Sequence, residues 1–368
     1  MSVATTRPPA SAGTAARVRF ELPPHHAATA PPEQRGLSRD RVRLLVADGT
    51  LTEHARFRDL PRYLRPGDLL VVNTSGTLPA AVDTRRAGRP AVLHFSTQLS
   101  ESAWAVELRP ADPRAHGPLR DATVGDRLPL PDGSALTLVA PHPADGPRAG
   151  SRLWLAERTG PGRVAEMLHR HGRPIRYDYV PARWPLSDYQ TVFAVHPGSA
   201  EMPSAARPFT PELVARLVTR GVAVAPVLLH TGVSSQEAGE PPYEEPYEVT
   251  APTARLVSAT RAGGGRVIAV GTTVVRALET VAGEDGGLRP GRGWTDLVLG
   301  PDRPARLVDA IVSGLHAPGA SHLQLLEAVV GTDVVQRAYD AAVRRGYLWH
   351  EFGDSSLLLR GQGPPGRP

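Results

Sequence analysis

The chain has 368 residues, 41% of them hydrophobic, which is enough for two domains with a well-buried core. It contains no cysteine, so disulfides, thiolate nucleophiles and metal sites with sulfur ligands are excluded. All 42 basic residues are arginine, and the lack of lysine excludes Schiff-base catalysis and a P-loop lysine. The net charge of +5 indicates a nucleic-acid partner only weakly.

The apolar runs and the ends of the chain bear on its location. The first 16 residues lack the apolar core of a signal peptide, and no apolar run approaches the roughly 18 residues that cross a bilayer. We therefore expect a cytoplasmic protein that makes no membrane contact. Residues 1–16 and 361–368 consist largely of small residues and proline, which predicts disordered tails.

Residues 17–77 predict the first part of an α/β core. An arginine-rich stretch at residues 35–43 leads into an apolar strand at 44–46. A short helical turn is predicted at 57–64, and a Pro-Gly-Asp turn at 66–68 precedes a buried strand at 69–73.

Residues 78–155 have a different sequence pattern, in which short β-like runs are separated by turns that contain Gly, Pro and Asp. The Asp132-Gly133 turn supplies the backbone angles that a hairpin needs. Strands at this spacing predict a small antiparallel β-barrel inserted in the chain, with strands at residues 80–84, 91–95, 104–108, 127–130, 135–139 and 152–155.

Residues 156–360 predict the rest of the α/β core, because helices alternate with strands there. The predicted helices are at residues 162–171, 211–220, 253–262, from 274 onward, 321–330 and 334–345. The predicted strands are at 222–230, 266–270, 310–315 and 356–359. The expected fold is thus a mixed α/β domain, formed by residues 17–77 and 156–360 and interrupted by the barrel.

Ligands of open α/β sheets bind beyond the carboxyl ends of the strands, so polar residues that end apolar runs are candidates for the site. One run ends in His230, another in Gly271-Thr272-Thr273 and a third in His316. A Gly-Thr-Thr turn that opens a helix directs backbone N–H groups and hydroxyls at an anion.

Arg276 and Glu279 follow on one face of that helix, where the arginine fork could hold a carboxylate and the glutamate a cation or ribose hydroxyls. The alternative is an ordinary threonine cap followed by a surface ion pair. His230 and His316 are candidates for proton transfer, although a single histidine is more often structural. A metal site of His230, His316 and Asp354 is a further alternative, without the close histidine spacing that would support it.

The stretch from Arg176 to Ala194 alternates aromatic and polar residues. It predicts either an exposed strand or a pocket lining in which tyrosine rings stack on a base or face a sulfonium. A second small-residue turn, Gly198-Ser199, follows it.

In chain order these motifs resemble the S-adenosylmethionine:tRNA ribosyltransferase-isomerases of the queuosine pathway, over about residues 20–359. The most specific match is residues 269–279, the segment around the Gly-Thr-Thr turn. The other matches are residues 69–73 with 78–80, 189–194, Gly198-Ser199, Leu229-His230 with Gly232, His316 with Pro318, and 352–354.

The resemblance implies an α/β domain interrupted by a small β-barrel. It also implies that the ribosyl part of S-adenosylmethionine is transferred to 7-aminomethyl-7-deazaguanine in tRNA and isomerised to give epoxyqueuosine, with release of adenine and methionine. S-adenosylmethionine is then a substrate, and neither a prosthetic group nor a metal is required. The implied partner is the tRNA anticodon loop. We expect the protein to be a monomer.

The resemblance also suggests roles for the candidate residues. Because the sulfonium acidifies the C5′ hydrogens, a base must remove one of them, and adenine must be helped to leave. We expect His230 or His316 to transfer protons, with Asp354 as a third catalytic candidate. The expected substrate-binding residues are Asn73, Tyr189, Gln190, Thr191, Gly198, Ser199, Gly271, Thr272, Thr273, Arg276 and Glu279.

Several positions depart from the family pattern. An Asn-Asp-Thr-Arg element reads Asn73-Thr74-Ser75-Gly76 here, a family histidine is Pro208, and a Lys-Ser pair is Gly319-Ala320. Residues 233–243 replace a further histidine-containing element. Because these changes remove charged or proton-transferring groups, two alternatives stay open. One is a divergent paralogue with a small-molecule acceptor, and the other is a module that binds nucleoside or tRNA without turnover.

Overall fold

The computed structural model describes residues 16–112, 115, 117–143, 151–233, 242–284 and 286–361. The α-helices are α1 (Val164–His171), α2 (Pro211–Thr219), α3 (Ala251–Ala262), α4 (Thr272–Thr280), α5 (Ser321–Val330) and α6 (Thr332–Arg344). The strands are β1 (Arg43–Ala47), β2 (Thr52–Arg56), β3 (Leu69–Asn73), β4 (Ser75–Thr77), β5 (Ala81–Arg86), β6 (Arg89–Gln98), β7 (Ala103–Pro110), β8 (Arg127–Pro129), β9 (Ala135–His142), β10 (Leu153–Thr159), β11 (His196–Ser199), β12 (Ala223–Leu229), β13 (Glu245–Val249), β14 (Val267–Val270), β15 (Gly291–Thr295), β16 (Ala310–Gly314) and β17 (Ser355–Leu359).

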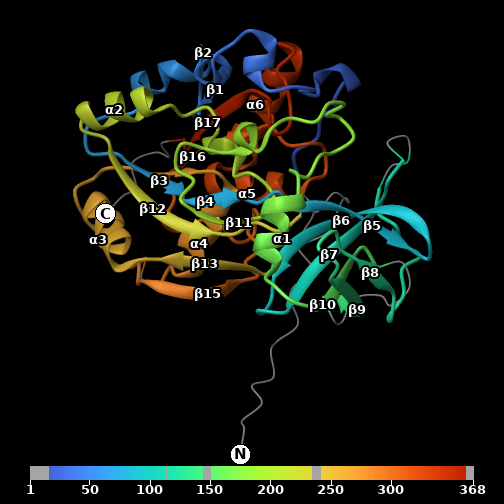
Figure 1. The fold of residues 1–368 in the computed structure, drawn as a ribbon. Helices are drawn as coiled ribbons and strands as arrows, with labels where there is room; N and C mark the ends of the chain where they lie inside the picture. The colour runs from blue at the N-terminus through green and yellow to red at the C-terminus, as the bar shows by residue number, and fades with distance from the viewer. Residues whose placement is uncertain are drawn as a thin grey trace, which may run out of the picture.

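A nine-stranded mixed sheet forms the larger part of the molecule, in the order β15-β13-β12-β3-β14-β16-β17-β1-β2 (Figure 1). Its centre, β12-β3-β14-β16, is parallel throughout. Strand β17 runs antiparallel to β16, so β17 begins at the edge where the four parallel strands end. That edge therefore collects the carboxyl ends of four strands and the segment that leads into a fifth.

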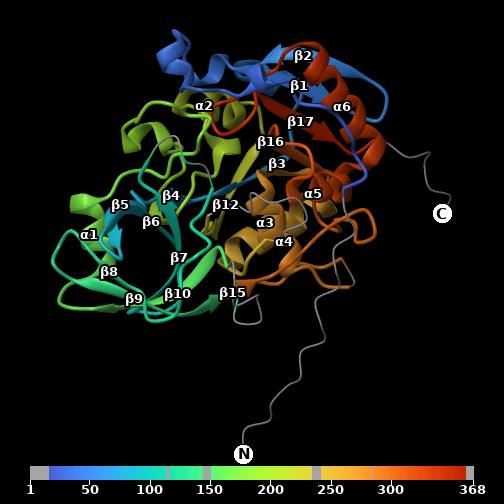
Figure 2. The same ribbon diagram turned by 90° about the vertical axis from the view of Figure 1, so that its right-hand side faces the viewer.

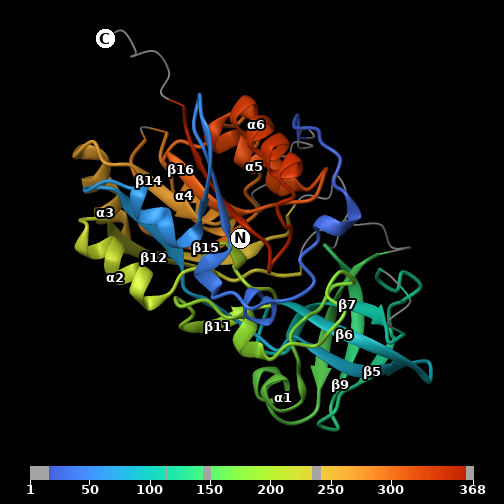
Figure 3. The ribbon, with the colours of Figure 1, turned by 90° about the horizontal axis from the view of Figure 1, so that it is seen from above.

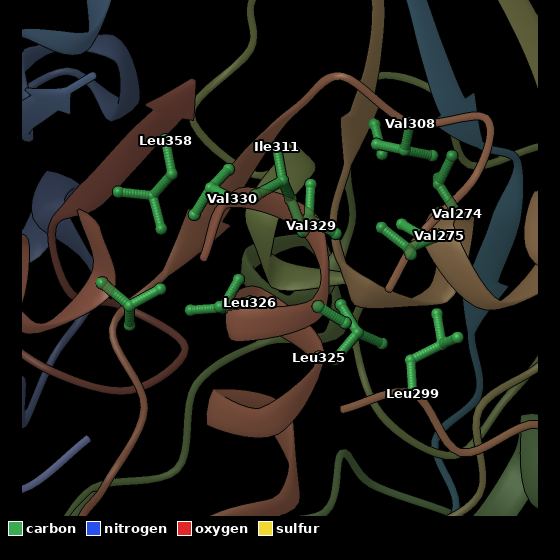
Figure 4. Packing of buried hydrophobic residues seen from close by; sticks show 14 of the residues in the cluster. Val274, Val275, Leu299, Val308, Ile311, Leu325, Leu326, Val329, Val330 and Leu358 are labelled. Atoms are coloured by element: carbon green, nitrogen blue, oxygen red, sulfur yellow. The ribbon is translucent and has the colours of Figure 1, made fainter. Parts of the chain in front are cut away.

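Apolar residues alternate between the two faces of this sheet, as the two-residue period of a strand requires. Leu45, Leu69 and Val71 face a core that contains residues of α3, α4, α5 and α6. Leu44, Leu70 and Val72 face a second core with Phe57, Leu60, Phe209 and residues of α2. Figure 4 shows the first core from close by, where the side chains of α4 and α5 meet those of β16 and β17. Both faces are covered, which is why the central strands are apolar on both sides.

The smaller sheet is antiparallel, with six strands in the order β5-β6-β7-β10-β9-β8, and it curls around its own apolar core (Figure 2). The Thr84 hydroxyl of β5 donates to the Pro129 carbonyl of β8, at 2.8 Å, and links the first strand of the order to the last. Seen from above, this sheet and helices α5 and α6 lie on opposite sides of the molecule (Figure 3). The expected mixed α/β fold with an antiparallel barrel is thereby confirmed.

Several local predictions differ from the structure. The predicted helical turn at 57–64 is a short 3-10 helix, Phe57–Arg62, and the helix predicted at 253–262 starts earlier, at Ala251, because the Thr250 hydroxyl caps it. Strands β2, β4, β11, β13 and β15 were not predicted, and the turn predicted at Gly198-Ser199 is the end of β11, which pairs with β4. Residues 189–194 form turns and the end of a 3-10 helix, so the exposed-strand alternative for them is wrong.

The boundaries of the predicted domains stay a prediction, and residues 1–15 and 362–368 of the predicted tails lie outside the described residues. Among the residues that the structure describes, no helix is long and apolar enough to span a bilayer.

Candidate functional site

A cavity of about 480 Å³ opens where the carboxyl ends of the parallel strands meet, as expected for an open α/β sheet. Residues from the start of α4, the loop after β16, the segment before β17 and the loop at 175–189 line it. Six of the predicted site residues are among them: Tyr189, Gly271, Thr272, Thr273, Arg276 and His316.

Gly271 shapes the start of α4. Its φ of 95° is open to glycine and strained for other residues, and it turns the chain sharply from β14 into the helix. No side chain of the described residues caps the helix, which leaves its first backbone N–H groups for a ligand or water. Thr272 and Thr273 line the cavity at this point, which makes the helix start a suitable anion site.

The guanidinium of Arg276 is largely committed to the protein itself. It donates to the carbonyls of Leu297 at 3.2 Å, Thr295 at 2.9 Å and Tyr243 at 3.1 Å, and it forms a buried ion pair with Glu245. Arg276 therefore ties the strands β13 and β15 to α4. It lines the cavity, but most of its hydrogen-bonding capacity is used in holding the wall.

Glu279 and Asn73 are likewise bonded within the protein. The Glu279 carboxylate accepts the backbone N–H groups of Arg306 at 2.9 Å, Leu307 at 2.8 Å and Val308 at 3.1 Å, and it does not line the cavity. The Asn73 amide donates to the Leu229 carbonyl at 2.8 Å and to the Thr273 hydroxyl at 3.2 Å. Asn73 therefore acts on the site through Thr273, whose side chain it holds.

Two histidines stack on the wall after β16. The rings of His316 and His322 lie 4.6 Å apart and nearly parallel, and the Ser313 hydroxyl is 2.9 Å from His316 Nε2. Burial lowers the pKa of His316 well below its usual value, with the neighbouring His322 and His350 adding to the effect. Burial also lowers the pKa of His322 to about 4. Both rings are therefore neutral at pH 7 and act as hydrogen-bonding groups rather than cations.

His230 lies behind the cavity wall, in a hydroxyl cluster. Its Nδ1 is 2.7 Å from the Ser75 hydroxyl, which in turn is 2.6 Å from the Ser199 hydroxyl. Gly198 packs so closely on the ring that a Cβ there would collide with it. The structure thus brings His230, Gly198 and Ser199 together, but in a cluster that does not line the cavity.

Of the three predicted site residues at 189–191, only Tyr189 lines the cavity. Tyr189 lines the cavity and packs edge-on against Phe352, with ring centres 5.1 Å apart. The Gln190 amide is used by the backbone of Thr77, to which it donates at 2.8 Å and from which it accepts at 3.0 Å. The Thr191 hydroxyl accepts the backbone N–H of Phe193 at 3.2 Å.

Asp354 is buried away from the cavity. It forms an ion pair with Arg43 at 2.7 Å and accepts the backbone N–H groups of Arg43 and Leu348, both at 2.8 Å. Among the described residues no group of three His, Asp or Glu side chains is placed to hold a metal ion, so the alternative of His230, His316 and Asp354 gains no geometric support.

Sequence reasoning missed the polar groups just before β17. Tyr179 and His350 stack with ring centres 4.0 Å apart, and the Tyr179 hydroxyl donates to Glu351 at 2.6 Å. Tyr177, whose hydroxyl bonds to Glu201, extends the aromatic wall. The cavity is lined by all of these residues: Tyr177, Tyr179, Glu201, His350 and Glu351. The sequence held one signal, because His350 and Glu351 directly precede the Phe-Gly-Asp motif. That signal points to the cavity only once β17 is known to start at the edge where the parallel strands end.

The arrangement combines three chemical features in one cavity. The uncapped start of α4 can bind a carboxylate, the tyrosine rings can stack on a planar base or face a cation, and the carboxyl and imidazole groups can exchange protons. Five of the positions that depart from the family pattern line the cavity: Val233, Pro242, Tyr243, Gly319 and Ala320. Residues 234–241 lie outside the described part of the chain.

Comparison with known proteins gives one consistent result. A family model described as queuosine biosynthesis protein matches residues 15–358. The chain is 36% identical over 351 residues to the S-adenosylmethionine:tRNA ribosyltransferase-isomerase of Moorella thermoacetica, with 92% of this chain and 98% of that protein covered. The protein of the same name from Thermus thermophilus is 34% identical over 358 residues, with the same coverage of 92% and 98%.

A solved structure agrees with these relatives. The crystal structure of the S-adenosylmethionine tRNA ribosyltransferase from Thermotoga maritima matches with a TM-score of 0.50 at 29% identity, covering 92% of this chain and 99% of that chain.

Proposed function

Since this chain belongs to the family of queuosine biosynthesis proteins, we propose that it is a transferase that moves the ribosyl group of S-adenosylmethionine to tRNA and isomerises it. The proposed acceptor is the aminomethyl group of 7-aminomethyl-7-deazaguanine in the anticodon loop. The product is epoxyqueuosine, and adenine and methionine are released. S-adenosylmethionine is consumed as a substrate.

One observation of the site carries the proposal. The cavity joins an uncapped helix start to an aromatic wall and a carboxyl group, and these are complements of the carboxylate, the base and the sulfonium of S-adenosylmethionine. A ligand with a negative end, a positive centre and a planar base fits the groups that the cavity offers.

We assign the residues as follows. The backbone N–H groups at Thr272 and Thr273 bind the methionine carboxylate, and Tyr177 and Tyr179 contact the base or the sulfonium. His316, neutral at pH 7, provides a hydrogen bond to the ribose or the leaving group. Arg276 supports the wall, because its partners are protein carbonyls and Glu245.

The decisive experiment incubates the purified protein with S-adenosylmethionine and tRNA that carries 7-aminomethyl-7-deazaguanine. We expect adenine and methionine to appear in equal amounts with the modified tRNA, and neither to appear with tRNA that carries guanine at that position. Release with small amines but not with tRNA would replace the acceptor by a small molecule. Binding of S-adenosylmethionine without any release would indicate a non-catalytic module.

A further inference from the structure

Glu351 is a carboxyl group in the wall of the cavity that forms no ion pair with any of the described residues. Its Oε2 accepts the Tyr179 hydroxyl at 2.6 Å, while its Oε1 is buried and has no hydrogen-bond partner in the described part of the chain. No ion pair of the described residues involves it. A buried oxygen without a partner is rare in native proteins and marks a candidate for contact with a ligand.

The charged and titratable groups around Glu351 come from three segments. Tyr179 and Tyr189 face it from the loop that lines the cavity, and His350 adjoins it. Arg207 acts on it from a distance, but its guanidinium is bonded to Glu33 at 2.9 Å and to the Asp188 carbonyl. Burial therefore dominates and raises the pKa of Glu351 to about 7.

The other candidate bases of the cavity are weaker or already occupied. The lowered pKa values of His316, His322 and His350 make them poor proton acceptors at pH 7. Glu245 and Asp178 form ion pairs with Arg276 and Arg109, and Glu201 is bonded to the Tyr177 hydroxyl. Glu351 combines a free oxygen with a proton affinity suited to neutral pH, which is the combination that a general base needs.

The backbone also distinguishes this segment. His350 has a φ of 73°, a conformation that is costly for a residue other than glycine, and its ring stacks on Tyr179. Strain of this kind persists where the surrounding structure enforces it, and it is common at active sites. Here it sets the position of the residue next to Glu351.

We propose that Glu351 is the general base that removes a C5′ hydrogen of S-adenosylmethionine, and that Tyr179 is its positioning residue. This inference rests on the proposed function. The C5′–H bond breaks, the proton forms an O–H bond at Oε1, and the electron pair stays on C5′, where the adjacent sulfonium stabilises it. Tyr179 keeps the carboxylate oriented through its hydrogen bond to Oε2.

The test uses the full chain and S-adenosylmethionine that carries deuterium at C5′. Loss of deuterium to water reports the proposed step directly, adenine release reports turnover, and calorimetry reports binding. The variants are Glu351→Gln, Glu351→Asp and Tyr179→Phe. A matched control is Glu53→Gln, because exposed Glu53 accepts the Tyr63 hydroxyl at 3.1 Å on the edge strand β2, outside the cavity.

We expect Glu351→Gln to slow deuterium loss and adenine release by about 100-fold or more, the usual contribution of a general base. Its affinity for S-adenosylmethionine should change by less than about tenfold, or about 1.4 kcal/mol. Glu351→Asp should recover part of the rate, and Glu53→Gln should match the wild type.

The pH profile separates a base from a structural residue. The wild-type kcat/KM should rise with pH and level off above about 7, since the base must be ionised. Tyr179→Phe should shift this rise of kcat/KM to higher pH, because the variant lacks the hydrogen bond that stabilises the ionised carboxylate of Glu351. Glu351→Gln should remove the rise.

The outcomes distinguish the two proposals. A wild-type protein that turns over tRNA while Glu351→Gln loses deuterium at the wild-type rate overturns the base and leaves the proposed function standing. Deuterium loss that depends on Glu351, without any tRNA product, supports the base and overturns the acceptor. A wild-type protein that neither loses deuterium nor releases adenine overturns both.

Discussion

The α4 side of the cavity and the side formed by the segment before β17 differ in how their polar groups are satisfied. On the α4 side, Arg276 and Glu279 are bonded to protein carbonyls, backbone N–H groups and Glu245. On the other side, Glu351 keeps an oxygen that none of the described residues contacts by a hydrogen bond, and His350 has a strained backbone. The charged residues of the strongest motif are bonded within the protein, and of the two only Arg276 lines the cavity. The group with unused bonding capacity lies outside that motif.

This difference has a general physical basis. A buried charge whose hydrogen bonds are all made within the protein stabilises the local structure and has little left to offer a ligand. A buried group without a partner lowers stability, and it is kept where a substrate supplies the missing contact. The two sides should therefore respond to substitution in opposite directions, the first losing stability and the second gaining it.

The largest effect is expected for Arg276→Ala. The substitution leaves Glu245 buried without its cation and removes the donors of three carbonyls, so the free energy of unfolding should fall by about 3–5 kcal/mol. Urea denaturation measures this, and Arg292→Ala, an exposed arginine on β15, should change it by less than about 0.5 kcal/mol. Unchanged stability together with a lost affinity for S-adenosylmethionine would show that Arg276 binds the donor and would remove the distinction between the two sides.

Glu279→Ala should have the next largest effect. It deprives the backbone N–H groups of Arg306, Leu307 and Val308 of a buried carboxylate, which should lower the free energy of unfolding by about 2–3 kcal/mol. Thermal unfolding of this variant beside Glu284→Ala, which removes an exposed glutamate, provides the measurement and its control. A variant of normal stability that fails to bind S-adenosylmethionine would place Glu279 among the ligand contacts.

The smallest effect, of opposite sign, is expected for Glu351→Gln. The pKa of Glu351 is raised from 4.5 to about 7 in the folded chain, so the unfolded chain releases this proton at lower pH. The stability that the folded chain gains from holding this carboxyl neutral is fully present below pH 4.5, and it is lost as the pH rises through 7. Glutamine stays neutral, so the variant should be more stable than the wild type by about 1–3 kcal/mol at about pH 8 and similar to it in acid. Equal stability of the two proteins across this range would mean that Glu351 carries no burial cost.

Local sequence patterns were enough to predict the elements whose apolar residues follow a regular spacing. The strands of the barrel and of the sheet centre were predicted within a few residues, because their apolar residues alternate or run together. Strands β2 and β15 were missed because they are the two edges of the large sheet, and β13 lies beside β15. Their side chains are mostly exposed or half-buried, so only the pairing with a neighbouring strand makes them strands.

By itself the sequence determined the mixed α/β core, the inserted barrel and the three strand ends where a site could form, since these depend on patterns within a few residues. Only the tertiary structure decided which polar groups are consumed by the protein and which stay available. Arg276 meets Glu245 across 31 residues, and Tyr179 meets Glu351 across 172. Burial and hydrogen-bond partners arise from segments far apart in the chain, and no local pattern carries that information.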